Sequence, residues 1–468
     1  MSFLPSRGNK HRRGAWRPSN PRTSTANDST ATPAPPFGDL LDEIRLEDLE
    51  RTANGFSDSS TIRDSVVEAS FNWIRTTNTG KPTIVIPGSP PRWTYHKSSM
   101  QLREDQGKFF RDRNAAQYPR HPMEPAIAAG IHCNPNLAMG IDIVACSSTL
   151  GNLLRFVRQQ EKSFRILVEL VDETLFLIRR ENSPTELIDG VRGFGHSFPE
   201  AYTTWDSDVK QSTSHQRLLR YNFGGLHLLV RFEADGYLPL PKNEASKPVT
   251  SLAKPSGHFN FESLAKSFEA AKVDPEEYLA LSSSTNDKLV AKQAGRAVGQ
   301  DRVFDLKTRS IWKKDRDLLS EEIPRLWLAQ ISNFVVAYHE KGVFKPENVL
   351  VRDVKQDVAK WETEQDAVLA QLAALLHTLI SKAREQKDGK FEIRRTEKGD
   401  FELRGQLNDA GEVLSQGVRK QWIRSSKKEA GSEKVDAMDA TNTLLWDDGT
   451  CDYTACTDAC QYCGHCTY

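Results

Sequence analysis

Two short apolar stretches of this sequence carry acidic residues at a spacing that suits metal chemistry. The first runs from Leu226 to Tyr237. In a β-strand, successive side chains point to opposite faces, so apolar side chains fill one face while Arg231, Glu233 and Asp235 share the other. This stretch can therefore be buried on one side and carry carboxylates on the other.

The second stretch, Arg302 to Arg309, shows the same alternation, which puts Val303, Asp305 and Lys307 on one face. Two such strands side by side bring two or three carboxylates and an ammonium group into one pocket. Clustered carboxylates raise one another's pKa, and the usual remedy is a hard divalent cation such as Mg²⁺, which takes oxygen ligands. A lysine at the mouth of such a site is placed to orient or deprotonate an attacking water molecule.

The order of these acids resembles the PD-(D/E)XK nuclease superfamily. Glu233-Ala-Asp235 stands in the place of its second motif, and Asp305-Leu-Lys307 stands in the place of its third. Asp305 replaces the longer glutamate of that third motif, so its carboxylate reaches one methylene less far.

The flanking segments resemble the DXO-type decapping nucleases, which trim faulty 5′ ends of RNA. Gly193 to Glu200 stands in the place of that family's glycine- and aromatic-rich segment, which ends in a metal-binding glutamate. Leu326 to Gln330, followed by Asn333 to Tyr338, resembles the family's Trp-x-x-Gln helix start and the apolar strand after it. The resemblance spans roughly residues 81–385 and is shared with a divergent fungal branch, often labelled geranylgeranyl pyrophosphate (prenyl-diphosphate) synthetase.

The resemblance implies a role for each residue of the pocket. It assigns the binding of Mg²⁺ or Mn²⁺ to Glu200, Asp235, Asp305 and the backbone carbonyl of Leu306. It gives the positioning and activation of water to Glu233 and Lys307, and the ordering of the site to Gln330. The implied function is metal-dependent hydrolysis at RNA 5′ ends, by decapping, pyrophosphohydrolysis or 5′ exoribonuclease action, and the implied partners are RNA 5′ ends and a 5′–3′ exoribonuclease.

Three other interpretations stay open. The chain could be a catalytically silent RNA-binding or scaffold paralogue that keeps the fold without turnover. The cluster could be a structural network of salt bridges joining Lys307 and Arg231 to the acids. A prenyl-diphosphate synthase is the third, and it needs two aspartate-rich motifs on buried helices, whereas the nearest match, Asp447-Asp448 with Asp452, lies near the C-terminus.

Several single residues near the expected cleft also have two interpretations. Arg155 and Arg158 follow apolar residues on an expected helix and could meet a phosphate, although an arginine on a helix face is more often a surface charge. His196 could touch substrate or could belong to a capped turn. We expect His215 and His339 to be structural.

The helices and strands expected around these residues indicate an α/β fold with a mixed, twisted central sheet flanked by helices. The periodicity favours strands at 164–171 and 174–180, a hairpin over 390–404 and one long packed helix over 358–384. A short amphipathic helix is expected over 38–51. This core domain would cover 38–420, with an insertion at 241–300 that could be a lid, a clamp or an obstruction.

Composition limits the remaining possibilities. Among 468 residues, Lys plus Arg and Asp plus Glu both number 63, so a basic surface for nucleic acid has to be local. No apolar run reaches the roughly 18 to 20 residues needed to span a bilayer and no signal peptide is evident, so we expect a protein of the nucleus, the cytoplasm or both, without membrane partners. Residues 1–37 read as a disordered basic arm, which could be a nuclear address, an RNA tether or a solvated tail.

The C-terminus is rich in cysteine. After a charged linker over 421–450, residues 451–468 hold five of the seven cysteines. Thiolates this dense in an intracellular chain favour metal binding over disulfides. The expected Zn²⁺ ligands are Cys456, Cys460, Cys463 and Cys466; an iron–sulfur centre or a redox-labile tail are the alternatives.

Overall fold

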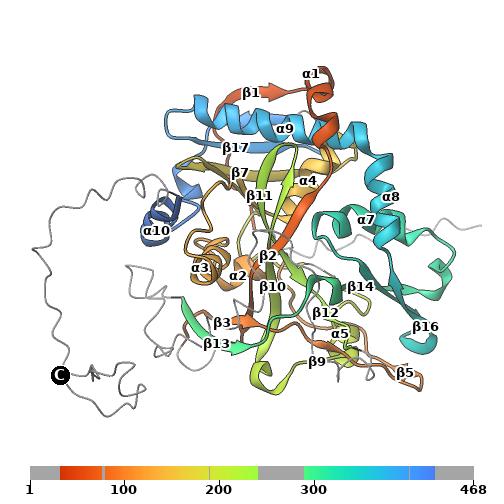
Figure 1. Ribbon diagram of the computed structural model, residues 1–468. Coiled ribbons are helices and arrows are strands. Elements are labelled where there is room, and N and C mark those ends of the chain that lie inside the picture. Colours follow the sequence, from red (N-terminus) through yellow and green to blue (C-terminus); the bar gives the residue numbers. More distant parts are fainter. Residues whose placement is uncertain (1–31, 76–79, 189, 241–288, 400, 427–468) are drawn as a thin grey trace, which may run out of the picture. The chain divides into compact units, whose positions relative to one another are not determined.

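The computed structural model describes residues 32–75, 80–188, 190–240, 289–399 and 401–426 of the chain. Among them, eleven strands form a larger sheet and seven form a smaller one (Figure 1). This confirms the predicted α/β fold with mixed sheets flanked by helices, and it divides the strands between two sheets instead of one.

The larger sheet mixes parallel and antiparallel neighbours. β6 lies parallel to both β8 and β11, whereas β10 is antiparallel to both of its neighbours. In spatial order its strands are β1 (Leu40–Ile44), β18 (Phe401–Arg404), β17 (Lys390–Arg395), β7 (Phe164–Val171), β8 (Thr174–Arg179), β6 (Ile143–Cys146), β11 (Leu226–Ala234), β10 (Ser212–Phe223), β2 (Arg63–Ile74), β3 (Thr83–Gly88) and β13 (Val290–Gly295).

The smaller sheet carries the second of the two acidic stretches. Its central strand β14 is parallel to β15 and antiparallel to β12. In spatial order its strands are β5 (Met100–Gln101), β16 (Val343–Asp353), β15 (Asn333–Glu340), β14 (Val303–Ser310), β12 (Gly236–Tyr237), β4 (Arg92–Trp93) and β9 (Thr203–Thr204).

Helices cover both faces of the larger sheet, which is why its central strands are apolar on both sides. In β6, Ile143 and Ala145 join a core with α4, α7 and α9, whereas Val144 joins a second core with α3 and α10. The helices are α1 (Leu46–Ala53), α2 (Arg113–Gln117), α3 (Glu124–Cys133), α4 (Ser147–Val157), α5 (Ser197–Tyr202), α7 (Leu318–Leu328), α8 (Lys355–Glu364), α9 (Asp366–Glu385) and α10 (Gln416–Ser426).

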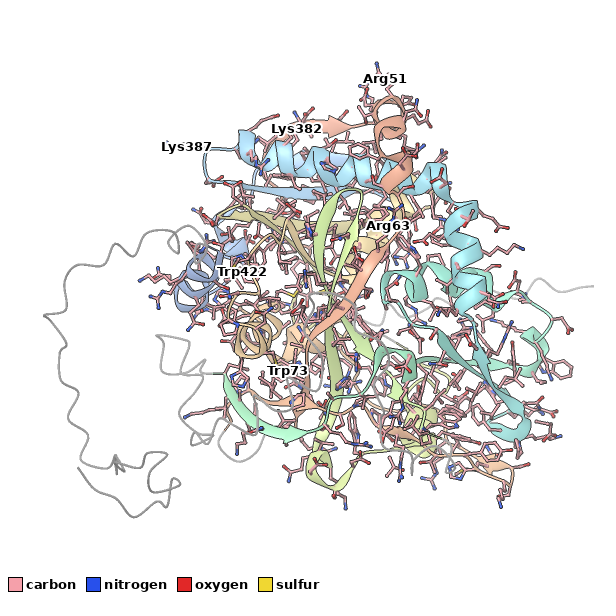
Figure 2. All side chains as sticks on the ribbon, in the orientation of Figure 1. Arg51, Arg63, Trp73, Lys382, Lys387 and Trp422 are labelled. Carbon is pink, nitrogen blue, oxygen red and sulfur yellow. The ribbon has the colours of Figure 1, made fainter. Side chains whose placement is uncertain are left out.

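Large aromatic side chains anchor this arrangement. Trp73 and Trp422 lie inside, whereas Arg51 and Lys387 point outward (Figure 2). The Trp422 ring, from α10, meets the Phe176 ring of β8 edge-on at 5.5 Å between centroids. This contact fixes α10 on the face of the sheet opposite α9.

Two expected helices differ from the structure. The first half of residues 38–51 forms β1, because its backbone pairs with β18, and only the second half is helical. The single helix expected over 358–384 is two helices that break at Gln365. The break lets α8 place Trp361 against Trp327 of α7, at 5.5 Å between ring centroids, while α9 packs its leucines on the larger sheet.

Several predicted segments lie wholly or partly outside the described residues. Most of the N-terminal arm, residues 241–288 of the insertion, the linker from 427 and the cysteine-rich tail with its four expected zinc ligands are among them. The end of the predicted insertion is described, and it forms the edge strand β13, parallel to β3. None of the helices in the described part is long and apolar enough to cross a bilayer.

Candidate functional site

Asp235 and Asp305 come together where the chain passes from one sheet to the other. Asp235 is the single residue between β11 of the larger sheet and β12 of the smaller. β12 pairs with β14, and the Leu306 amide of β14 donates a 2.7 Å hydrogen bond to Asp235 Oδ2. This close approach needs Gly236, because a Cβ there would lie 2.4 Å from the Phe304 ring. The two acidic stretches are thus neighbours, as the sequence predicts.

The two carboxylates interact strongly. Burial, and then the charge of Asp305, raise the pKa of Asp235 to about 7, against the opposing effects of Arg325 and the Leu306 amide. Asp305 itself is buried, with 4% of its surface exposed. A buried carboxylate such as Asp305, with a second carboxylate beside it, is stabilised by a nearby cation.

That cation is Arg325 of α7. Its Nη1 contacts Asp305 Oδ2, and its Nη2 lies 2.6 Å from Asp305 Oδ1, so the guanidinium engages both carboxylate oxygens. Its Nη2 also lies 2.9 Å from Glu322 Oε2, one helical turn earlier. Burial lowers the pKa of Arg325, but Asp305 and Glu322 outweigh it and raise the pKa above the ordinary value. This arginine is therefore fixed in its charged form.

The other two charged residues assigned from the sequence lie beside this cluster. Lys307 Nζ lies 3.7 Å from Glu322 Oε1, which also lies 3.3 Å from Arg309 Nη2. Glu233 is exposed, 3.5 Å from Arg113 and 3.1 Å from the Gln216 amide. Both charges therefore have partners within the protein.

Arg231 stays on the face of β11 that the strand alternation predicts, since Arg231 and Glu233 both contact Gln216. Arg231 is buried and donates to Gln216 Oε1 at 3.1 Å and to Cys146 Sγ at 2.9 Å. The network of salt bridges beside Asp305 is consequently built from α7 and β14, without Arg231.

Glu200 and Gln330 do not join the Asp235–Asp305 pair. Glu200 is exposed on α5, where its charge acts on His196, whose ring stacks on Phe109 at 3.7 Å. Gln330 follows the end of α7 in a left-handed conformation (φ 50°). Its side-chain amide donates a 2.7 Å hydrogen bond to the Trp327 carbonyl. The Trp-x-x-Gln segment is therefore a helix end rather than a helix start, and Gln330 closes that end.

The residues as placed do not fit a divalent metal ion. Among the described residues, no group of three or more His, Cys, Asp and Glu side chains could hold one. Arg325 engages both oxygens of Asp305, and Glu200 does not join the pair. We therefore derive no chemical step through a metal at this site.

Sequence reasoning missed the contribution of α7. The signal was present, since Glu322 and Arg325 are three residues apart on the polar side of a helix whose apolar side includes Leu319, Ile323 and Leu326. What the spacing does not show is that this polar side faces β14.

A cavity of about 800 Å³ opens beside Arg325 and Glu322. Its α4 wall carries Arg155 and Arg158, both half-buried. Arg155 donates a 2.9 Å hydrogen bond to Asn152 Oδ1, and the Arg158 guanidinium lies 5.7 Å from the centre of the Trp361 ring. In the described part of the chain neither guanidinium forms an ion pair.

Burial disfavours the charged form of both arginines on this wall. Burial lowers the pKa of Arg155, opposed by the charge of Glu322. Burial, and then the charge of Arg155, lower the pKa of Arg158. Both guanidiniums therefore line the cavity as half-buried charges without an ion-pair partner among the described residues.

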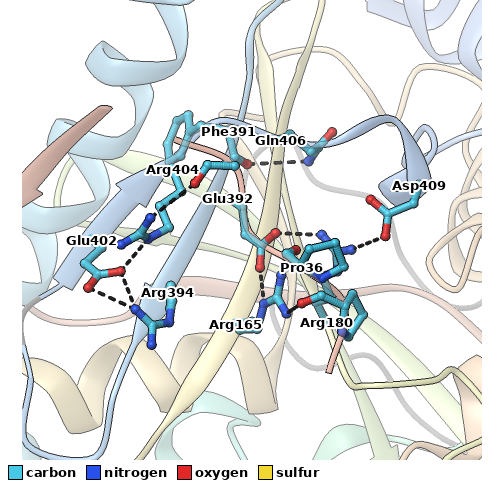
Figure 3. A network of polar contacts seen from close by, with 12 residues as sticks. Pro36, Arg165, Arg180, Phe391, Glu392, Arg394, Glu402, Arg404, Gln406 and Asp409 are labelled. Carbon is cyan, nitrogen blue, oxygen red and sulfur yellow. Dashed lines mark hydrogen bonds and ion pairs between the residues drawn. The ribbon is translucent and has the colours of Figure 1, made fainter. Parts of the chain in front are cut away.

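Two other arginines that line the cavity, Arg165 and Arg180, are already neutralised (Figure 3). Glu392, 1% exposed, contacts Arg165 through one oxygen and lies 2.6 Å from Arg180 through the other. Arg180 also lies 2.8 Å from Asp409. Of these four arginines, only Arg155 and Arg158 remain available to an anion.

Comparison with solved structures found low-identity likenesses. The structure is similar to Candida albicans Rai1 in complex with pU5 and Mn²⁺ (9% identity, 83% of this chain and 100% of that chain, TM-score 0.49). It is similar to Scheffersomyces stipitis Rai1 in complex with (3′-NADP)⁺ and calcium (12%, 83% and 99%, TM-score 0.49) and to K. lactis Dxo1 in complex with manganese (8%, 80% and 96%, TM-score 0.39).

Comparison by sequence gives one family. No curated protein matches the chain. The family model described as a domain of unknown function, DUF8563, matches residues 54–401, which is more than half of the chain. The chain therefore belongs to the DUF8563 family.

Proposed function

We propose that this chain binds the phosphorylated 5′ end of RNA in the cavity beside α4, without a metal ion. The observation that supports the proposal is the half-buried pair Arg155 and Arg158, which face a cavity of about 800 Å³ and form no ion pair in the described part of the chain. A terminal phosphate supplies the missing negative charge and accepts hydrogen bonds from both ends of an arginine fork. The resemblance of the sequence motifs to DXO-type nucleases favours an RNA end among phosphate ligands.

The arginines that line the cavity differ in how free they are to contact the RNA end. Arg155 and Arg158 offer the phosphate positive charge that has no ion-pair partner among the described residues. Arg165 and Arg180, which also line the cavity, are held by Glu392. The arginines without an ion-pair partner are confined to this cavity. A terminal phosphate bound there therefore gains more binding free energy than the other phosphates of the strand. We therefore expect RNA with a 5′-phosphate to bind more tightly than the same RNA with a 5′-hydroxyl.

The test is a binding titration by fluorescence polarisation in EDTA. Short RNAs labelled at the 3′ end carry a 5′-triphosphate, a 5′-monophosphate or a 5′-hydroxyl. The double variant Arg155→Gln/Arg158→Gln should lose about tenfold or more in affinity for the phosphorylated RNAs, since a hydrogen bond to a charged group contributes roughly 1.5–3 kcal/mol. It should also lose the preference for a 5′-phosphate.

A matched control is available on the surface. Arg51 is exposed and paired with Asp48 on α1, so Arg51→Gln should bind every RNA as wild type does. Equal binding of 5′-phosphate and 5′-hydroxyl RNA by the wild type, or full affinity in the folded double variant, would contradict the proposal.

A metal-dependent hydrolase acting on RNA 5′ ends is the second candidate. The observation that favours it is that Asp235 and Asp305 lie close enough for Asp305 to raise the pKa of Asp235. For a metal ion to bind, Arg325 must first leave Asp305. Release of product from triphosphate, monophosphate or unmethylated-cap RNA that requires Mg²⁺ or Mn²⁺, and that Asp305→Asn abolishes, would establish this candidate.

A further inference from the structure

The protein supplies cations of its own beside the Asp235–Asp305 pair. Arg325 engages Asp305 and Glu322, and Lys307 and Arg309 approach Glu322 from β14. Three cations therefore lie beside the pair: Lys307, Arg309 and Arg325. A divalent ion added there would meet positive charge that is already in place.

The geometry of Arg325 also excludes a second cation from Asp305. The guanidinium fork lies against both oxygens of that carboxylate, where an ion with ligand distances near roughly 2.1 Å has to sit. Glu322, on the same helix as Arg325, binds the other side of the guanidinium. Arg325 Nε donates a 3.1 Å hydrogen bond to Glu322 Oε2. The fork is thus fixed at both ends by side chains that α7 and β14 present.

We infer that Arg325 is the resident counter-cation of the Asp235–Asp305 pair and stands in the place of a divalent metal ion. The wild-type pair therefore takes up neither Mg²⁺ nor Mn²⁺. Removal of the guanidinium leaves two neighbouring carboxylates without their cation, and this creates a site for one. The inference does not depend on RNA binding, and it excludes the metal-dependent candidate for this site.

Titration of the full-length chain with Mn²⁺, followed by electron paramagnetic resonance of the free ion, tests this inference. Wild type and Asp305→Asn should bind the same amount of Mn²⁺, because the pair contributes no site. Arg325→Gln should bind about one more Mn²⁺ per chain than the wild type does. Adding Asp305→Asn to Arg325→Gln should remove this gain.

Two further variants separate the guanidinium from its surroundings. Arg309→Gln removes a cation that contacts Glu322 but not Asp305, so it should gain no site. Arg325→Lys keeps the charge, so it should gain no site either. Ions held elsewhere in the chain are common to all variants and cancel in the comparison.

Either of two results overturns the inference. One is Mn²⁺ binding by the wild type that Asp305→Asn abolishes, and this comparison needs no arginine variant to fold. The other is an Arg325→Gln protein that keeps the wild-type circular dichroism spectrum and gains no Mn²⁺. RNA affinity is measured separately in EDTA, so failure of the RNA proposal and failure of this inference are distinguishable.

Discussion

Replacement of Asp235 by Asn should stabilise the protein at neutral pH, because the carboxylate is held where its charge is disfavoured. Burial and the Asp305 charge raise the pKa of Asp235 from 3.8 to about 7. A shift of about 3 units, at about 1.4 kcal/mol each, gives an upper bound of about 4 kcal/mol of lost stability once the group is ionised. Asn keeps the oxygen that accepts from the Leu306 amide, so the fold is retained.

The sign of the pH dependence follows from the direction of the shift. Between about pH 4 and pH 7 the native state holds a proton at Asp235 that the unfolded state has released, so the contribution of this group to stability falls as pH rises. Below pH 4 both states are protonated and the difference vanishes. The advantage of Asp235→Asn should therefore be near zero at pH 4 and largest above pH 7.

Urea denaturation of wild type and Asp235→Asn at pH 4, 5.5 and 7.5 measures this difference. A matched control has the opposite sign: the hydrogen bond from Lys382 lowers the pKa of Asp42, so Asp42→Asn should slightly destabilise the protein at pH 7.5. If Asp235→Asn is less stable than wild type at pH 7.5, or if its advantage does not change with pH, then Arg325 compensates the pair fully and our reasoning on Asp235 is wrong.

Three further substitutions test the packing that holds the cavity and the sheets. Glu392→Gln should cost on the order of 3–5 kcal/mol in urea denaturation, since it removes a buried charge bridging two arginines. Leu376→Ala, on the buried face of α9, should cost about 2–5 kcal/mol in the same assay. Gly224→Ala should lower the melting temperature more than Gly225→Ala: both have positive φ, but only at Gly224 would the new Cβ meet another atom, 2.6 Å from Ala373.

The sequence predicts elements well where the information is local. β7 and β8 agree with the predicted strands to within one residue, because β-branched and leucine-rich runs flank the turn at Asp172. The boundary at Gln365 is not local. The residues on both sides have helical spacing, and only the contact of Trp361 with Trp327 explains the break.

The candidate site shows the same difference between what local sequence patterns predict and what depends on packing. Alternation along two strands predicts that Asp235 and Asp305 meet, and the pairing of β12 with β14 brings this about. The partner of Asp305 could not be predicted, because the orientation of α7 depends on its packing against α4 and α8. Glu200 was assigned from a segment whose helix, α5, turns that side chain to the surface.

The one-residue link between the sheets has a consequence for hydrogen exchange. The Leu306 amide belongs to the smaller sheet, but its 2.7 Å acceptor is a carboxylate attached to the end of a strand of the larger sheet. The protection of the Leu306 amide against hydrogen exchange therefore depends on both sheets. If the sheets move apart at this point, this amide should exchange early, ahead of the amides within the β10–β11 ladder, whose protection depends on the larger sheet alone.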